Sequence, residues 1–475
     1  MTFEERLGNE MTESAAWLRS QRWFGDKARD LTNITIDVAA IAHLEAEHAA
    51  LLIVRCSFAE GEDARYFVPV AGLSHEAALN DASSPSAALT IRDAMRDSSF
   101  LAWFFEGFRQ ERVGKDGGVW RWRMEPGAVR DLATIDALDT HIMAVEQSNT
   151  SILYDHRIMA KVFRRVQTGI NPDLEVTEYV TTVAGFAHVP KLYGVFSLGL
   201  ESEELTLGVL QQFVGNVGDG WTWLLGELRT LTPDRASKLA KQIGLLGTRT
   251  GELHVALGAA TENVAFAPEV MTPAQVEVLQ SRGAAELDET ISALRMHGNK
   301  NDDELALLSK KLRSRISEAT ALIGTLTIRV HGDYHLGQVL RTLEEDFAII
   351  DFEGEPSRTI EQRRQKYSPL RDVAGMLRSL DYATGAIGRE INDASSHELV
   401  QQWGIDARQC FLEAYQQAIS AGDSRLVPQS SREFDAALHI LEIEKSLYEA
   451  RYELNNRPDW LAIPWNALNQ LAGSL

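Results

Sequence analysis

The chain has 475 residues, and its 47 Lys and Arg against 68 Asp and Glu give a formal charge of −21. Such an acidic balance disfavours binding to nucleic acid, which depends on basic groups that neutralise phosphates. The length suggests about two or three domains, and the apolar fraction of 44% excludes a disordered or collagen-like chain.

Two cysteines are too few for a disulfide framework, and no stretch reaches the roughly 18 apolar residues typical of a membrane span. The N-terminus also lacks the basic and apolar regions of a secretion signal. These features predict a soluble, cytoplasmic protein that binds neither nucleic acid nor membranes.

Residues 1–100 read as a small α+β unit. An apolar, β-prone run at 49–58, an acidic turn and a second run at 65–70 predict a hairpin.

Short strands and one helix are predicted in residues 101–214. Lys161 alternates with apolar neighbours in a strand at 158–163, and two more strands are expected at 191–198 and 205–214. The helix follows Asn171 and carries Glu175 and Glu178.

Residues 215–475 are predicted to be mostly helical after a Gly-rich loop at 215–220. Thr272, Pro273 and Gln275 have the spacing of a capped helix start. Strands are expected at 326–330 and 347–350, and a long helix at 438–455.

Polar side chains follow those two strands, and three of them have an informative spacing. Asp333 and Gln338 lie five residues apart, and Asp351 follows thirteen residues later. Phosphoryl transfer needs a carboxylate that orients and deprotonates a hydroxyl, together with oxygen ligands for Mg²⁺. The spacing matches the protein-kinase pattern with Gln in place of Asn. We therefore predict Asp333 as the catalytic base and Gln338 and Asp351 as Mg²⁺ ligands.

A kinase also needs a cation on the phosphates of ATP, usually a strand lysine held by a helix carboxylate. Lys161 fits this role, with Glu175 or Glu178 as its partner. A polar segment before the strand has backbone amides and hydroxyls that suit phosphate, and backbone groups at 210–214 suit adenine. The predicted nucleotide-binding residues are thus Lys161, Glu175, Gln147, Ser148, Asn149, Thr150, Ser151, Gln212 and Val214.

Taken together, these segments resemble the maltokinase family, within the larger group of aminoglycoside-phosphotransferase-like and protein-kinase-like sugar kinases. The resemblance covers most of the chain and is carried by residues 21–25, 146–151, 161–165, 169–175, 331–340, 351–356, 368–376 and 448–460. It implies an α+β, bilobal protein-kinase-like fold, with an N-terminal cap at 1–100, a nucleotide-binding part at 101–214 and a helical C-terminal lobe at 215–475. Residues 25–29 depart from the string that we associate with the cap.

The resemblance further implies phosphorylation of maltose at its anomeric hydroxyl by ATP and Mg²⁺, in trehalose and α-glucan metabolism, and a functional association with trehalose synthase. Asp372 is expected to anchor the catalytic loop. His335 is expected to brace that loop or contact substrate, and Glu353 to contact substrate or metal or to pair with arginine, as we expect of Glu355. The implied acceptor-binding residues are His335, Glu353, Tyr448, Glu449, Tyr452, Arg457 and Trp460.

Three alternatives remain at this point. A kinase of the same fold could act on glucosamine, another amino sugar or an aminoglycoside, and overall charge does not decide between acceptors. A metal-dependent hydrolase could use His331, Asp333, His335 and Asp351 as ligands, but it leaves Lys161 and Gln338 without a task. The third alternative is a catalytically silent binding protein, but such a protein has no need for the complete set of base, metal ligands and lysine.

Overall fold

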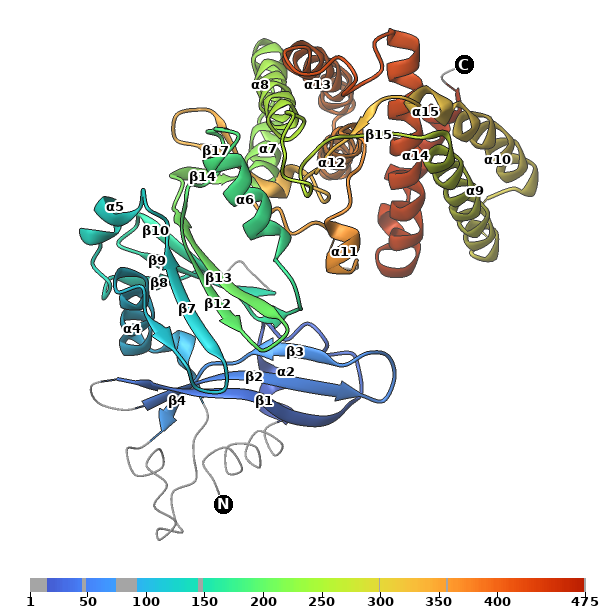
Figure 1. Ribbon diagram of the computed structural model, residues 1–475. Coiled ribbons are helices and arrows are strands. Elements are labelled where there is room, and N and C mark those ends of the chain that lie inside the picture. The colour runs from blue at the N-terminus through green and yellow to red at the C-terminus, as the bar shows by residue number, and fades with distance from the viewer. Residues whose placement is uncertain are drawn as a thin grey trace. The chain divides into compact units, whose positions relative to one another are not determined.

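The computed structural model describes residues 15–44, 48–73, 92–143, 148–298, 300–355 and 358–473. The chain divides into two compact units (Figure 1). The N-terminal unit comprises residues 1–177 and 190–214, and the C-terminal unit comprises 178–189 and 215–475. None of the helices in the described ranges is long and apolar enough to cross a membrane. The three-part division at residues 100 and 214 stays a prediction.

The first sheet of the N-terminal unit has the strand order β11-β3-β2-β4-β5, and β1 also pairs with β2. Its strands are β1 (Leu31–His43), β2 (His48–Phe58), β3 (Ala64–Phe67), β4 (Val70–Leu73), β5 (Arg92–Asp93) and β11 (Arg165–Val166). The predicted hairpin is confirmed as β2 and β3, although β3 ends at Phe67. Alternate residues of β2 enter two different apolar clusters, Leu51 in one and Leu52 in the other. Both faces of β2 are covered, which explains its continuous apolar run.

Helix α2 (Ala15–Ser20) and the turn after it contribute to one of these clusters, through Leu18, Trp23 and Phe24. The cluster packs these side chains against Tyr66 of β3, whose ring centroid is 4.9 Å from that of Phe24. The segment that resembles the maltokinase cap is therefore part of the core of the N-terminal unit.

The second sheet of this unit has the order β6-β7-β12-β13-β10-β9-β8. Its strands are β6 (Val113–Gly114), β7 (Val119–Met124), β8 (Thr140–Ile142), β9 (Asn149–Tyr154), β10 (Ile158–Phe163), β12 (Leu192–Gly199) and β13 (Glu204–Gln212). Helix α4 (Ser98–Arg109) packs Phe104 against Trp122 and Phe196 of this sheet. The strands predicted around Lys161 and at 191–198 and 205–214 are confirmed. Helices α5 (Val129–Ala133) and α6 (Pro172–Thr182) complete the element order.

The C-terminal unit is mostly helical. Its helices are α7 (Gly220–Arg229), α8 (Pro233–Leu257), α9 (Pro273–Met296), α10 (Asp302–Ser317), α11 (Ile360–Arg363), α12 (Leu370–Glu390), α13 (Ala394–Ile419), α14 (Ser431–Asn456) and α15 (Ala462–Gly473). The helix start at Thr272 is confirmed with a complete capping box, and the helix predicted at 438–455 lies within α14. The sheets of the N-terminal unit and the helices of the C-terminal unit confirm the α+β class.

Two small sheets complete the C-terminal unit. One has the order β14-β17-β18, with β14 (Asn216–Asp219), β17 (Val339–Thr342) and β18 (Phe347–Ile349); the other pairs β15 (Glu269–Val270) with β16 (Leu326–Thr327). Two predictions were wrong in detail here. The Gly-rich segment at 215–220 forms β14 instead of a loop, because β17 pairs with it, and the strand predicted at 326–330 ends at Thr327.

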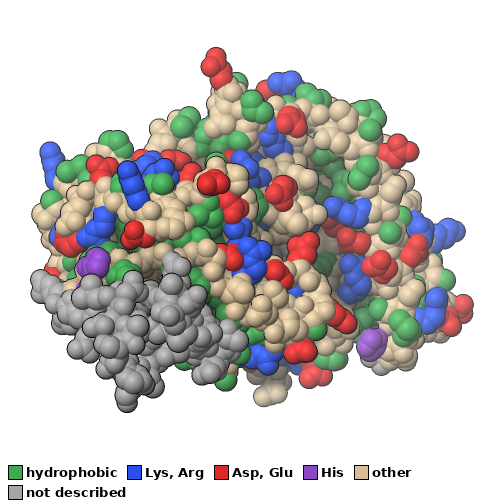
Figure 2. Space-filling view, turned by 60° about the horizontal axis from the view of Figure 1, so that its bottom comes forward, with side chains coloured by type: hydrophobic (Ala, Val, Ile, Leu, Met, Phe, Trp, Pro, Cys, Tyr) green, Lys and Arg blue, Asp and Glu red, His purple; other side chains and the backbone are tan. Residues whose placement is uncertain are grey.

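Charged side chains of both signs are interspersed over the face shown in Figure 2, and no broad basic surface gathers there. This agrees with the acidic composition of the chain.

Helices α8 and α13 approach closely at Gly247. A Cβ atom at this position would overlap the carbonyl oxygen of Phe411, an atom of the α13 backbone that cannot swing aside. We expect Gly247→Ala to lower the free energy of unfolding by about 1–3 kcal/mol through overpacking. Gly226→Ala on α7 is the control, because nothing lies within 4 Å of its added methyl group; this change should be neutral or stabilising. Equal melting temperatures for the two variants would contradict the close approach.

Candidate active site

The N-terminal unit holds Lys161 in the middle of a sheet. Lys161 lies on β10 between Ser151 of β9 and Val209 of β13, and it is only 4% exposed. Its Nζ atom lies 2.9 Å from Oδ2 of Asp173 in the first turn of α6. A buried lysine keeps its charge when a carboxylate compensates the lost hydration. The geometry thus provides a fixed cation at the sheet.

Asp173 was not predicted as the partner of Lys161, because the expected carboxylates, Glu175 and Glu178, lie further along the helix. The side chain of Asn171 accepts a hydrogen bond from the Asp173 backbone, 2.8 Å, and so fixes the start of α6. Asn171 followed by Pro172 is a helix-start signal that could have pointed to Asp173. Glu175 is buried on the same helix, and the choice between Glu175 and Glu178 as a further partner stays open.

The predicted phosphate segment is only partly described, because Gln147 lies outside the described residues. Ser148 is exposed, whereas Asn149, Thr150 and Ser151 form the start of β9. Thr150 accepts a hydrogen bond from Nε of Arg164, 2.8 Å. The Ser151 hydroxyl is buried opposite Lys161 and has no protein partner in the described part of the chain. An unpaired buried hydroxyl next to a buried cation suits an anionic ligand.

The predicted adenine segment lies at the end of β13. Gln212 is exposed, and its backbone N–H donates to the carbonyl of Lys191, 2.8 Å. Val214 is half-buried and is the last residue of the N-terminal unit.

A buried arginine, Arg164, connects the segment around Trp23 to β9. The sequence did not predict this connection. Arg164 is fully buried, and its guanidinium lies 2.7 Å from Oδ2 of Asp93. The same carboxylate oxygen accepts a hydrogen bond from the Trp23 indole, 3.0 Å. Through Thr150 and Asp93, Arg164 therefore links Trp23 to the strand that faces Lys161.

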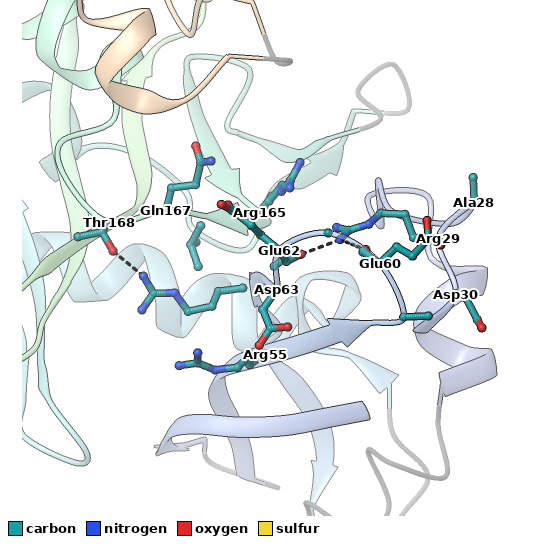
Figure 3. Close-up of a pocket in the computed structure, with 15 residues that line it drawn as sticks. Ala28, Arg29, Asp30, Arg55, Glu60, Glu62, Asp63, Arg165, Gln167 and Thr168 are labelled. Atoms are coloured by element: carbon teal, nitrogen blue, oxygen red, sulfur yellow. Dashed lines mark hydrogen bonds between the residues drawn. The ribbon is translucent and has the colours of Figure 1, made fainter. Parts of the chain in front are cut away.

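Figure 3 shows a broad hollow elsewhere in the N-terminal unit, rimmed by residues 28–30, 59–65 and 165–168. Three of its arginines already have partners. Arg29 donates to the carbonyl of Glu62, 2.6 Å; Arg55 pairs with Asp37, 2.8 Å; and Arg65 pairs with Glu203, 2.6 Å. Arg29 also pairs with Asp26, 3.1 Å, so these three charges are compensated within the protein, and we assign no anion site to the hollow.

The C-terminal unit holds the catalytic-loop candidates, and Asp372 anchors that loop as expected. Its carboxylate accepts hydrogen bonds from the backbone amides of His331, 2.7 Å, and Gly332, 3.0 Å. His254 lies 3.2 Å from the same carboxylate. Burial by itself raises the pKa of Asp372, but the hydrogen bonds and the nearby histidines outweigh burial and lower it.

Both histidines of the loop brace it. Nε2 of His331 lies 2.8 Å from the carbonyl of Ile350, and Nδ1 of His335 accepts from the backbone of Gly337, 3.0 Å. Because a carbonyl oxygen only accepts, His331 must carry its proton on Nε2, which prevents that nitrogen from binding a metal. Only the buried Nδ1 of His331 would remain for the metal of the hydrolase alternative, and that alternative still leaves Lys161 and Gln338 without a task. Burial lowers the pKa of His335, and the charge of Asp333 partly opposes the shift.

The two predicted metal ligands are neighbours along a hairpin. Gln338 precedes β17 and Asp351 follows β18, and the backbone of Ile350 donates to the carbonyl of Gln338, 3.0 Å. Asp351 has a φ of +69°, an uncommon conformation for a residue other than glycine and one that clusters at functional sites. The hairpin thus presents an amide and a carboxylate, whose oxygen atoms fit Mg²⁺.

Asp333 lies in a small pocket of the C-terminal unit. Its side chain is 25% exposed, and Oδ1 lies 3.8 Å from Nζ of Lys445 on α14. The pocket is lined by residues of both charges together with Tyr448: Glu286, Asp333, Glu355, Arg358, Arg371, Asp372, Glu444 and Lys445. Glu355 pairs with Arg358 and Arg371, as expected. Burial raises the pKa of Glu355, but these cations and Lys445 outweigh it and lower the pKa.

Of the predicted acceptor residues, Tyr448 alone lines this pocket. Glu449 is buried in an ion pair with Arg378, 2.8 Å, and burial raises its pKa. Tyr452 stacks on Tyr448, with 6.4 Å between ring centroids.

The other predicted acceptor residues also have local contacts. Arg457 pairs with Glu453, 2.7 Å, and Trp460 stacks on Tyr382, 6.3 Å. The carbonyl of Glu353 accepts from Arg363, 3.1 Å. Their acceptor-binding roles stay predictions.

Residues 17–97 match the family model of the maltokinase N-terminal cap domain. The chain is 27% identical over 334 residues to a glucosamine kinase of Streptacidiphilus jiangxiensis, covering 69% of this chain and 72% of the relative. It is 26% identical over 340 residues to a glucosamine kinase of Mycolicibacterium smegmatis, covering 69% and 78%.

Solved structures agree on the fold. A glucosamine kinase in complex with glucosamine, ADP and inorganic phosphate superposes with a TM-score of 0.70, covering 99% of both chains at 22% identity. A glucosamine kinase in its crystal form A gives a TM-score of 0.68, covering 93% of this chain and 92% of the other at 23% identity.

Fold and comparisons together define a phosphotransferase that acts on a hydroxyl acceptor, with a protein-kinase-like fold. More narrowly, the chain is a sugar kinase that carries a maltokinase-type N-terminal cap, and its resemblance to the maltokinase and aminoglycoside-phosphotransferase-like kinases is confirmed.

Proposed function

We propose that this protein transfers the γ-phosphoryl group of ATP to a hydroxyl of a small amino sugar of the glucosamine type. The observation that carries the proposal is a buried carboxylate oxygen, Oε2 of Glu444, which has no hydrogen-bond partner among the described residues and lies in the pocket that contains Asp333. Buried polar atoms without a protein partner are rare and suggest a missing ligand or water. The other oxygen of this carboxylate, Oε1, already pairs with Arg282 and Arg371, and an ammonium group would supply a hydrogen bond to Oε2.

Glu286 supports the same acceptor. Its carboxylate lines the pocket on the side of α9, and its pKa is raised by burial and then by the negative charge of Glu444. A cation held between these two carboxylates would relieve their repulsion. Arg451 and Arg282 already offset part of this repulsion, and a neutral disaccharide would add no further compensation.

The chemistry assigns a task to each predicted residue. Asp333 orients the acceptor hydroxyl and accepts its proton, while Lys161, held by Asp173, binds the phosphates. Gln338 and Asp351 would hold Mg²⁺, which neutralises charge on the phosphates. The buried Ser151 hydroxyl beside Lys161 and the oxygen donors of the β17–β18 hairpin fit this assignment.

Maltose is the second candidate acceptor, and the maltokinase-type cap at residues 17–97 favours it. Synthesis of maltose 1-phosphate and an association with trehalose synthase would follow from this alternative. The discriminating experiment is coupled ADP release with glucosamine, maltose, glucose, trehalose, choline and kanamycin, followed by phosphorus NMR of the product. The proposal expects glucosamine to give the highest kcat/KM. Preference for maltose would replace the proposed acceptor, and absence of turnover with every acceptor would contradict the proposed activity.

The acceptor assignment makes a specific prediction for Glu444. We expect Glu444→Gln to lower kcat/KM for glucosamine at least about tenfold, because it removes a charged hydrogen-bond partner worth more than about 1.4 kcal/mol. The kcat/KM for glucose should change much less, since glucose has no ammonium group. Glu413→Gln, at an exposed position on α13, is the matched control and should leave both values unchanged. An equal loss for the two sugars would show that Glu444 acts on the pocket as a whole.

A further inference from the structure

Three metal-ligating side chains gather in the N-terminal unit, away from Lys161 and its contacts. They are Asp139, His141 and His156, and one ligand atom from each lies within 4.8 Å of the others. Asp139 immediately precedes strand β8, and His141 lies within it. His156 belongs to the turn that joins β9 to β10. Strand β8 is the edge strand of this sheet and lies beside β9 (Figure 1).

The backbone fixes these positions relative to one another. The amide of Asp155 donates to the carbonyl of Asp139, 2.9 Å, and His141 pairs with Leu153 in the β8–β9 register. Asp155 and His156 have φ values of +49° and +50°, which are those of a tight two-residue hairpin turn. Histidine tolerates this backbone conformation, so the turn holds the His156 backbone in a defined position.

The donor atoms are close to the spacing of a metal centre. Oδ1 of Asp139 lies 3.2 Å from Nε2 of His141, and the two imidazole rings are 4.7 Å apart between centroids. Ligands at the usual zinc distances are about 3.3 Å apart in a tetrahedral site. Side-chain rotations that move the donor atoms by about an ångström would therefore place all three within bonding distance of one ion.

We propose that Asp139, His141 and His156 form a binding site for a divalent transition-metal ion such as Zn²⁺. Two imidazole nitrogens and one carboxylate suit Zn²⁺, Co²⁺, Ni²⁺ or Cu²⁺, whereas Mg²⁺ prefers oxygen ligands. The site is thus distinct in chemistry from the magnesium site proposed at Gln338 and Asp351. The side chains of Asp139 and His141 are 41% and 53% exposed, so water can complete the coordination shell.

A simple surface ion pair would account for Asp139 and His141 but not for His156. Two protonated imidazoles this close would repel each other, whereas two neutral imidazoles can share a metal ion. The bound ion would tie the hairpin turn, through His156, to β8, a strand of three residues whose partner among the described strands is β9. Metal binding should therefore slow amide exchange in β8.

The test is a zinc titration of the full chain, stripped with chelator and kept in excess Mg²⁺ to occupy oxygen-rich sites. Calorimetry should show that the parent chain binds one zinc ion and that substitution of either histidine weakens or abolishes this binding. We expect His141→Ala and His156→Ala each to weaken binding at least tenfold, since even outer partners of metal ligands contribute about that factor. His297→Ala, an exposed histidine on the C-terminal unit, is the matched control and should bind zinc like the parent.

Hydrogen exchange and cobalt spectra give readouts that do not depend on kinase activity. Zinc should slow exchange at residues 140–142 in the parent and in His297→Ala, but not in His141→Ala. Cobalt should give visible bands that both site variants lack. The proposal is overturned if saturable binding is absent in the parent, or if it persists unchanged in both site variants. Melting curves recorded with chelator show whether each variant remains folded. If one variant is unfolded, the cobalt spectrum of the parent still tests the site.

Discussion

Replacing Asp333 by Asn should reduce kcat at least about a hundredfold, the lower end of what general-base assistance contributes. The amide keeps the size of the side chain but cannot accept the proton of the acceptor hydroxyl. Lys445, 3.8 Å from the carboxylate, would then face a neutral group. Stopped-flow or coupled measurement of ADP release at saturating ATP and acceptor gives kcat directly.

The same variant should bind nucleotide and remain folded nearly as the parent does. Asp333 is partly exposed, and its ion-pair contacts, His335 and Lys445, lie at 4.0 and 3.8 Å, so their loss should affect stability little. Asp303→Asn, at an exposed position in the first turn of α10, controls for a general effect of removing one charge. Retention of most activity in Asp333→Asn would refute the assigned base and with it the proposed arrangement of the reaction.

Local sequence patterns predicted the elements that carry the candidate residues. Alternation identified β10 around Lys161, and the capping box at Thr272 marked the start of α9. The strand predicted before Asp351 is confirmed as β18, whereas its hairpin partner β17, which follows Gln338, was not predicted. The confirmed features depend on interactions within a few residues or within one hairpin, which is why the sequence reveals them.

Local sequence patterns could not predict which residues line the pocket around Asp333. Glu286 and Glu444 come from α9 and α14, and the Arg378–Glu449 pair joins α12 to α14. Periodicity shows which face of a helix is apolar but not which helices meet. Glu449 was predicted as an acceptor residue from its neighbours in sequence, and the sequence did not show that a buried arginine from another helix pairs with its carboxylate.

Asp372→Ala should lower the free energy of unfolding by about 3–5 kcal/mol, the usual cost of removing one member of a buried charged network. Asp372 is 1% exposed, and its loss leaves the amides of His331 and Gly332 without an acceptor. Those amides belong to the loop that carries Asp333, so kcat should fall as well. Denaturant unfolding monitored by circular dichroism measures the first effect, and ADP release in native buffer measures the second.

The pH dependence separates the loss of this carboxylate from a general packing defect. Because the folded-state pKa of Asp372 is lowered, its ionisation stabilises the protein above the unfolded pKa of about 3.9, and this contribution is lost as the pH falls through the folded pKa. The difference between the parent and Asp372→Ala should therefore be largest near neutral pH and shrink in acid. A packing defect would give a difference that does not depend on pH.

Asp393→Ala is the matched control, because Asp393 also lies at a helix start but is exposed and caps only α13. Loss of such a cap typically costs about 1 kcal/mol and should leave kcat unchanged. If the two variants lost equal stability and Asp372→Ala kept its turnover, Asp372 would be an ordinary helix-start residue. The loop around Asp333 would then have to be held by the contact of His331 with Ile350 and by the packing of Gly332 against Gly354, where a Cβ on Gly332 would lie 3.4 Å from the Gly354 Cα.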